Sequence, residues 1–158
     1  MVSKSGPLLQ VALNGDRMHP ATPRTPGDIA AQAATSVAAG AGAVHLHVFD
    51  EGRQTLAAGP CAQTLRAVRA ACPGIPISLS TFAQIESDPS RRRVLVGKWT
   101  ELPDLVTANQ GEEGIVELCE MLLARGVGIE AGLLSLGDAR RFVASGLAAR
   151  CTRVRRSH

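Results

Sequence analysis

The chain has 158 residues, enough for one domain with a sizeable core, and we treat residues 1–158 as a single domain. It is 45% hydrophobic but only 3% aromatic, with no tyrosine, a composition that suits helices packed on a sheet better than an all-β sandwich. The formal charge of +3 comes largely from arginines in residues 91–93 and 150–156, and because no aromatic residues alternate with them, we expect no nucleic-acid binding.

The first half of the chain alternates between strand and helix patterns. Residues 8–13 predict a strand, and a loop rich in turn-forming residues follows it. A helix then begins after Thr25, with Pro26 at its first position and Asp28 completing a capping box, and ends near residue 40. A second helix is predicted over residues 57–71, where Cys72-Pro73-Gly74 stops it.

Between these helices, the apolar strand Val44-His45-Leu46-His47-Val48 carries two histidines one residue apart. Because side chains alternate along a strand, His45 and His47 face the same side of the sheet. Two imidazoles on a rigid support can hold one metal ion. Two ordinary half-buried histidines would give the same pattern, so the pair alone does not decide between these interpretations.

The second half of the chain repeats the alternation. Strands are predicted over residues 77–81, 103–108 and 127–131, and residues 151–154 can begin a sixth. Helices are predicted over residues 89–98 and 113–125, and a third opens at the capping box Ser135 to Asp138 and ends at residue 146. About five β-α units in a row predict a parallel sheet with helices outside it.

Polar side chains near the carboxyl ends of the strands favour a barrel over an open, doubly wound sheet. They are Asn14, His45, His47, Ser80, Thr81, Thr107, Asn109 and Glu130. A barrel gathers all its strand ends around one axis, whereas an open sheet concentrates functional groups at a switch point. No glycine-rich phosphate loop follows the first strand. We therefore predict an α/β fold of the (β/α)8 TIM-barrel type.

A complete barrel needs at least about 200 residues. We therefore expect an incomplete TIM barrel, the N-terminal portion of a truncated chain, whose open sheet edges favour homo-oligomers. The four cysteines, at positions 61, 72, 119 and 151, form no Cys-x-x-Cys pair, which fits reduced thiols. The chain shows no signal peptide and no apolar run of membrane-spanning length, so we expect a cytoplasmic protein without membrane contacts.

Several motifs follow one another along the chain. They are Ala12-Leu13-Asn14-Gly15, His19-Pro20, Thr25-Pro26-x-Asp28-Ile29, Gly42-Ala43-Val44-His45-Leu46-His47-Val48, Ile77-Ser78-Leu79-Ser80-Thr81, Gly126-Val127-Gly128-Ile129-Glu130-Ala131-Gly132 and Ala144-Ser145-Gly146-Leu147. Taken together, they resemble the β-keto acid cleavage enzymes, such as the 3-keto-5-aminohexanoate cleavage enzyme of lysine fermentation. The resemblance implies a zinc-dependent barrel in which a β-keto acid and acetyl-CoA exchange acyl groups, giving acetoacetate and a new acyl-CoA.

The resemblance also implies site residues. His45 and His47 match the two histidine ligands of Zn2+, and Glu130 matches a catalytic carboxylate near the metal. A substrate-binding set is implied as well: Asn14, Arg17, Ser80, Thr81, Thr107 and Asn109. Arg17 stands where the lysine-pathway enzyme has a glutamate for the substrate amino group, which suggests a neutral or anionic keto acid. From the residues alone, the hydroxyl and amide groups can also be strand-end caps, and Arg17 can be a solvated loop arginine. Glu130 can form a structural pair with an arginine, but its place at the strand end favours a site role.

Family members take a third, carboxylate ligand from a late strand, together with an arginine and an aspartate, and we expect these strands to lie beyond this chain. A non-catalytic barrel remnant that acts only through self-association or a partner is therefore the alternative function. Another His-x-His metal barrel, such as a hydrolase, is disfavoured because amidohydrolases usually carry the pair on the first strand.

Overall fold

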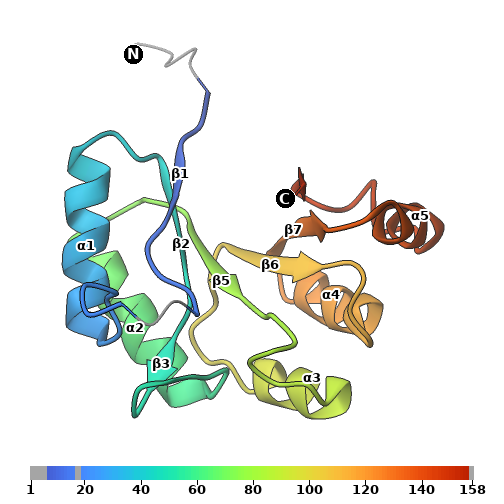
Figure 1. Ribbon diagram of the computed structural model, residues 1–158, viewed down its shortest axis with the longest axis horizontal. Helices are drawn as coiled ribbons and strands as arrows, with labels where there is room; N and C mark the ends of the chain where they lie inside the picture. The colour runs from blue at the N-terminus through green and yellow to red at the C-terminus, as the bar shows by residue number, and fades with distance from the viewer. Residues whose placement is uncertain (1–6, 17–18, 157–158) are drawn as a thin grey trace.

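Within residues 7–16 and 19–156, which the computed structural model describes, six parallel strands form a sheet that curls into half of a barrel, with five helices outside it (Figure 1). The strands are β1 (Gln10–Ala12), β2 (Ala43–Leu46), β5 (Ile77–Ser80), β6 (Leu105–Asn109), β7 (Gly128–Leu133) and β8 (Arg153–Arg156). The helices are α1 (Pro26–Ala38), α2 (Ala58–Ala71), α3 (Pro89–Gly97), α4 (Ile115–Ala124) and α5 (Leu136–Ala144). None of these helices is long and apolar enough to cross a membrane.

The order of the strands in the sheet is the order in which they occur along the chain, β1-β2-β5-β6-β7-β8, and every pair is parallel. A doubly wound sheet would reverse this order at a switch point. A sheet that adds each new strand to the same edge and curls is the construction of a β/α barrel. The predicted incomplete barrel is therefore confirmed.

Side chains alternate between the two faces of the sheet, and each face has its own chemistry. Val44, Leu46 and Leu79 are almost fully buried in the core between the sheet and the helices. His45 lies between Val44 and Leu46, and Ser78 comes directly before Leu79. Both therefore face the hollow of the half-barrel, where they contact each other. The apolar face thus builds the core, and the opposite face is left for polar groups.

The predicted starts of α1, α3 and α5 are confirmed, whereas α4 begins at Ile115, two residues later than predicted. The side chain of Thr25 accepts the backbone N–H of Asp28 at 3.1 Å, and a complete capping box joins Ser135 to Asp138. Asp88 caps α3 by accepting the backbone N–H of Arg91 at 2.7 Å. These caps set where these three helices begin, and thereby the lengths of the loops before them.

A short hairpin after β2 was not predicted from the sequence. Its strands are β3 (Phe49–Asp50) and β4 (Arg53–Gln54). The two turn residues, Glu51 and Gly52, both have positive φ, 47° and 77°. Such backbone angles characterise the two-residue turns that suit the twist of hairpins. The hairpin returns the chain towards β2, beside the second histidine.

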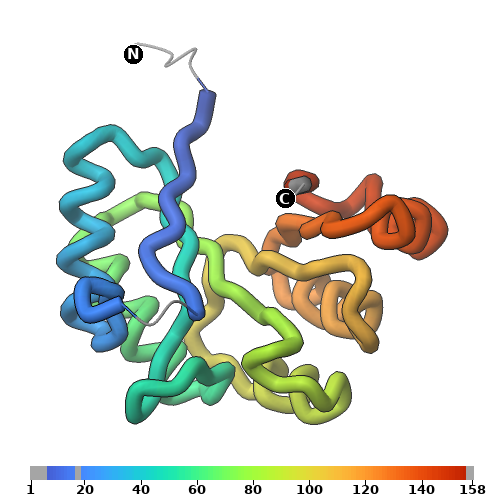
Figure 2. The backbone as a smooth tube through the Cα atoms, viewed as in Figure 1, coloured from blue at the N-terminus to red at the C-terminus, as the bar shows by residue number. Residues whose placement is uncertain are grey.

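Figure 2 shows the backbone of the first strand and that of the C-terminal segment on either side of a gap. Side chains link the first and last strands of the half-barrel across the hollow. Gln10 of β1 donates a hydrogen bond to Glu130 of β7 at 3.4 Å and accepts one from Arg153 of β8. Arg153 in turn pairs with Glu130 at 2.8 Å. These three residues form what we call the interior clasp.

Candidate functional site

His45 lies on the inner face of β2, where two hydroxyl groups surround one of its ring nitrogens. Nδ1 lies 3.1 Å from Ser78 Oγ of β5 and 3.3 Å from Thr107 Oγ1 of β6. The two hydroxyls are themselves 3.2 Å apart. The ring is thus fixed through Nδ1 by the adjacent strand β5 and by β6, the strand beyond it. Nε2 is its second nitrogen, the one a metal would use.

His47 follows the last residue of β2 and is held by its backbone as well as its ring. Its N–H donates to Asn14 Oδ1 at 2.7 Å, and its carbonyl accepts from Asn14 Nδ2 at 3.0 Å. Its Nδ1 lies 2.6 Å from Gln54 Oε1 in the hairpin. Because an amide oxygen only accepts, Nδ1 carries the proton and Nε2 keeps a lone pair.

The two imidazoles meet edge to face, with ring centroids 5.5 Å apart and planes at 90°. Two imidazoles on one tetrahedral zinc, with Zn–N of about 2.1 Å, have centroids about 5 Å apart. Burial, together with the smaller effects of the nearby His47, Arg155 and Arg153, lowers the pKa of His45 to about 3. Burial also lowers the pKa of His47, although the Gln54 hydrogen bond opposes this. Both rings are therefore neutral near pH 7, the form that binds metals.

The part of the chain that the structure describes places no third metal ligand beside His45 and His47. Among the residues that the structure describes, no group of three or more His, Cys, Asp or Glu side chains is placed to hold a metal ion. His45 and His47 thus fit two positions of a zinc site, whereas a catalytic zinc ordinarily has three protein ligands.

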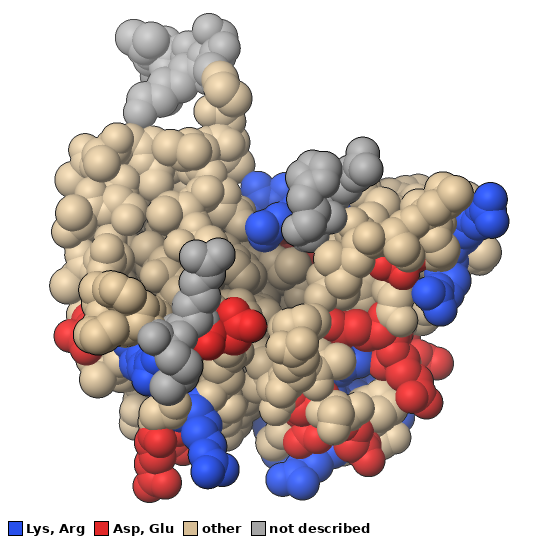
Figure 3. Space-filling model, in the orientation of Figure 1, with Lys and Arg blue, Asp and Glu red and all other residues tan. Residues whose placement is uncertain are grey.

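Glu130 lies on the inner face of β7 and belongs to the interior clasp. Its carboxylate is 3.8 Å from Arg155 NH1, in addition to the closer contact with Arg153. A cavity of about 360 Å3 opens beside it, lined by Gln10, Ala12, Glu130, Arg153, Val154 and Arg155. In Figure 3 the molecule is hollowed between its first strand and its C-terminal segment, and basic side chains gather at the edge. The catalytic role of Glu130 stays a prediction.

Four of the predicted substrate-binding residues, Ser80, Thr81, Thr107 and Asn109, lie in or just after the carboxyl-terminal parts of β5 and β6, which we call the rim. Thr81 is fully buried, and its hydroxyl donates to the Thr107 carbonyl at 3.0 Å, so it joins the two strands. Ser80 pairs with Thr107 in the sheet register, and Asn109 ends β6. Arg17 lies outside the described residues. The contacts of all the predicted substrate-binding residues with substrate stay predictions.

Sequence reasoning missed several residues that support the site. Gln54 and Ser78 fix the two rings, and Arg153 holds Glu130. Asn14 was expected under the substrate, but both ends of its amide are used on His47 and on the Pro23 carbonyl at 3.0 Å. The one local signal available was Gly52 after Glu51, which is typical of a two-residue hairpin turn.

Comparison with known proteins agrees with the motifs. The protein-family model described as beta-keto acid cleavage enzyme matches residues 8–146. The matched segment includes both histidines, Glu130 and every predicted rim residue. It stops before β8, so the two arginines that line the cavity lie beyond it. No curated protein matched the chain.

Lowering the pH from about 7 to about 5 is expected to destabilise the fold through His45. Its folded-state pKa of about 3 lies below the ordinary value of 6.5, so between these values the unfolded state binds a proton that the folded state does not. The free energy of unfolding should therefore be highest above pH 6.5 and fall by up to about 1.4 kcal/mol per pH unit below it. Urea unfolding at several pH values measures this slope. An equal slope in His45→Asn would contradict the prediction, and His19→Ala, at an exposed histidine, serves as the control.

Asn14→Asp keeps the size of the side chain but removes the NH2 group that serves the His47 and Pro23 carbonyls. A carboxylate would also face both carbonyl oxygens. We expect the free energy of unfolding to fall by about 1–3 kcal/mol at pH 7. Urea denaturation tests this, and a variant as stable as the wild type would show that these bonds do not hold the loop.

Proposed function

The chain belongs to the β-keto acid cleavage enzyme family, and on that premise we propose that it exchanges acyl groups between a β-keto acid and acetyl-CoA with the help of zinc, releasing acetoacetate and a new acyl-CoA. The observation that carries the proposal is the pair of neutral imidazoles, each fixed through Nδ1, at the hollow of the half-barrel. Family membership carries the general reaction, cleavage of a β-keto acid, and the donor set supports the metal.

His45 and His47 would hold the zinc through their Nε2 atoms. When bound, zinc supplies Lewis acidity towards the β-carbonyl oxygen of the substrate. The protein groups behind the rings keep this pair in place: Ser78 and Thr107 on one side, Gln54 on the other. Outer partners of this kind fix ring orientation and raise metal affinity.

The rim residues would bind and orient the keto acid. Ser80 and Asn109 stand at the ends of adjacent strands, and Thr81 secures the first of these ends against the second. Asn14 acts through His47, by holding its backbone in place. Glu130 is proposed to move a proton at the substrate, with Arg153 Nε 2.8 Å away fixing the carboxylate.

Charge at the cavity supports an anionic substrate. Arg153 and Arg155 line it together with a single carboxylate, that of Glu130, so this group of three side chains has one positive charge in excess. A guanidinium with an incompletely used set of donors favours a carboxylate ligand. This agrees with the expectation from Arg17, that the substrate is a neutral or anionic keto acid.

A non-catalytic role through self-association or a partner is the alternative. Four large apolar side chains on and near α5 and β8 are more than half exposed, namely Leu134 (56%), Leu136 (69%), Val143 (70%) and Val154 (54%). Exposed large apolar side chains favour association where they form a patch. Zinc content separates the two functions, since the association role needs none. A homo-oligomeric, cytoplasmic enzyme remains our expectation.

Purified protein should bind close to one zinc ion per chain and turn over a β-keto acid with acetyl-CoA. His45→Ala is expected to lower zinc affinity by about 100-fold or more, because one of two neutral nitrogen ligands is lost. Metal analysis together with a coupled assay for acetoacetate checks both points. His19→Ala removes an exposed imidazole and should change neither. Full zinc content in His45→Ala would remove the basis of the proposal.

Arg155→Gln should raise KM for the keto acid about tenfold or more with a smaller change in kcat, because a charge-assisted contact to the substrate carboxylate is lost. Arg150→Gln is the matched control, since Arg150 pairs with Glu120 at 2.6 Å on the outer surface. Steady-state kinetics of both variants give the comparison. Equal KM values in the two variants would place the substrate carboxylate elsewhere.

A further inference from the structure

A buried ion pair lies behind the rim and connects α3 with the loop that follows β6. Arg92 of α3 is 1% exposed, and its NH1 lies 2.5 Å from Glu112 Oε2. Its NH2 donates to the Glu113 carbonyl, also at 2.5 Å. Burying two charges has a large desolvation cost, and a hydrophobic pair of similar size often replaces such a pair without loss of stability. Stability alone therefore does not explain this pair.

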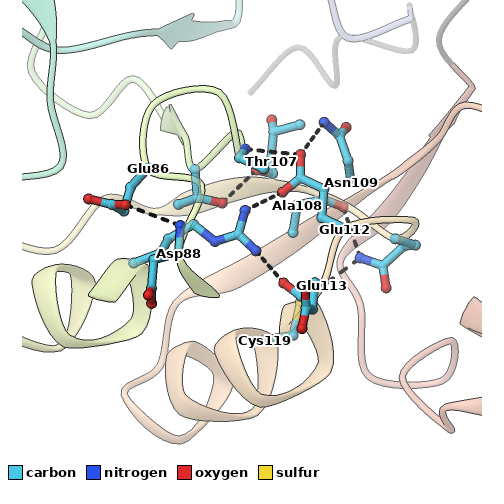
Figure 4. A network of polar contacts seen from close by, with 12 residues as sticks. Glu86, Asp88, Thr107, Ala108, Asn109, Glu112, Glu113 and Cys119 are labelled. Atoms are coloured by element: carbon cyan, nitrogen blue, oxygen red, sulfur yellow. Dashed lines mark hydrogen bonds and ion pairs between the residues drawn. The ribbon is translucent and has the colours of Figure 1, made fainter. Parts of the chain in front are cut away.

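The second oxygen of Glu112 is directed to the rim. Oε1 accepts from Asn109 Nδ2 at 3.0 Å and from the backbone N–H of Ala83 at 3.1 Å (Figure 4). Ala83 belongs to the loop that continues from Ser80 and Thr81. One carboxylate therefore holds the loop after β5 and the amide at the end of β6 at the same time.

This contact also determines which way the Asn109 amide is turned. A carboxylate oxygen bound in this way accepts only, so the NH2 group of Asn109 must face Glu112 and its Oδ1 must face away. On that other side lies Gly132 of β7, where a Cβ atom would be 2.3 Å from Oδ1. The absence of a side chain at Gly132 gives Oδ1 its room. Glu112 thus orients the amide, and Gly132 leaves the space that this orientation needs.

We propose that Arg92 and Glu112 are positioning residues that set the geometry of the substrate-binding rim. Arg92 holds the Glu112 carboxylate, and Glu112 holds Asn109 and the loop at Ala83. The inference rests on the proposed function in one respect, that Ser80, Thr81 and Asn109 bind the keto acid. Neither member of the pair is placed to touch the substrate. Misplacement of a binding group by about 1 Å can cost about 100-fold in rate.

Glu112→Gln tests the role of the carboxylate most directly. It keeps the shape of the side chain, but its NH2 group cannot accept a hydrogen bond from Arg92. In zinc-loaded protein, we expect kcat/KM for the keto acid to fall by about 10- to 100-fold with unchanged zinc content. Arg92→Lys, which keeps a cation beside Oε2, should retain more activity than Arg92→Met. Gly132→Ala disturbs Asn109 from the other side and should lower kcat/KM in the same way.

Arg91→Gln is the matched control. Arg91 is the neighbouring residue on α3 and pairs with Glu86 at 3.1 Å, but its side chain is 73% exposed. Its loss removes an ion pair from the same helix without touching the rim, so kcat and KM should stay at wild-type values. If Glu112→Gln and Gly132→Ala lower kcat/KM no more than Arg91→Gln does, the proposal is wrong.

A measurement that needs no catalysis follows the pair directly. In 15N NMR spectra, Glu112→Gln should speed amide exchange at Ala83 by about tenfold or more and shift the side-chain NH2 signals of Asn109, whereas Arg91→Gln should do neither. Unchanged exchange and signals would overturn the proposal. If the wild type cleaves no β-keto acid, the proposed function fails, and the exchange data still decide whether this pair sets the rim.

Discussion

Alternation along parallel strands places the core and the candidate site of this protein on opposite faces of a single layer. Val44 and Leu46 pack beneath the helices, while His45 between them faces the hollow. The neutral state of His45 follows from the same placement, because burial there penalises the charged ring. The proposed metal site and the core thus both depend on one register, and a shift of one residue would exchange the faces.

Local patterns in the sequence were sufficient to predict the parallel sheet and its helices, but not the hairpin of β3 and β4. Strand and helix patterns, the capping residues Thr25 and Ser135, and the polar strand ends together predicted the curled sheet that the structure shows. The histidine pair was predicted because its spacing reflects the period of a strand, although His47 lies just past the end of β2. Each of these signals depends on neighbours a few residues away.

Contacts between distant segments could not be predicted in this way. Asn14 bonds to His47, which lies 33 residues further along the chain, and nothing near Asn14 in the sequence indicates this partner. The same holds for Arg92 and Glu112, which meet only because α3 and the loop after β6 pack together. What supports a site is therefore harder to predict than the site itself, because it is determined by the packing of the whole chain.

The interior clasp gives this fold a property that a closed barrel lacks. In a closed barrel, backbone hydrogen bonds join the first strand to the last, and dissolved ions hardly affect them. Here Gln10, Glu130 and Arg153 make that link, and the guanidinium is partly open to solvent. Counterions weaken such charged contacts as ionic strength rises. The width of the cavity beside Glu130 should therefore vary with the electrolyte around the protein.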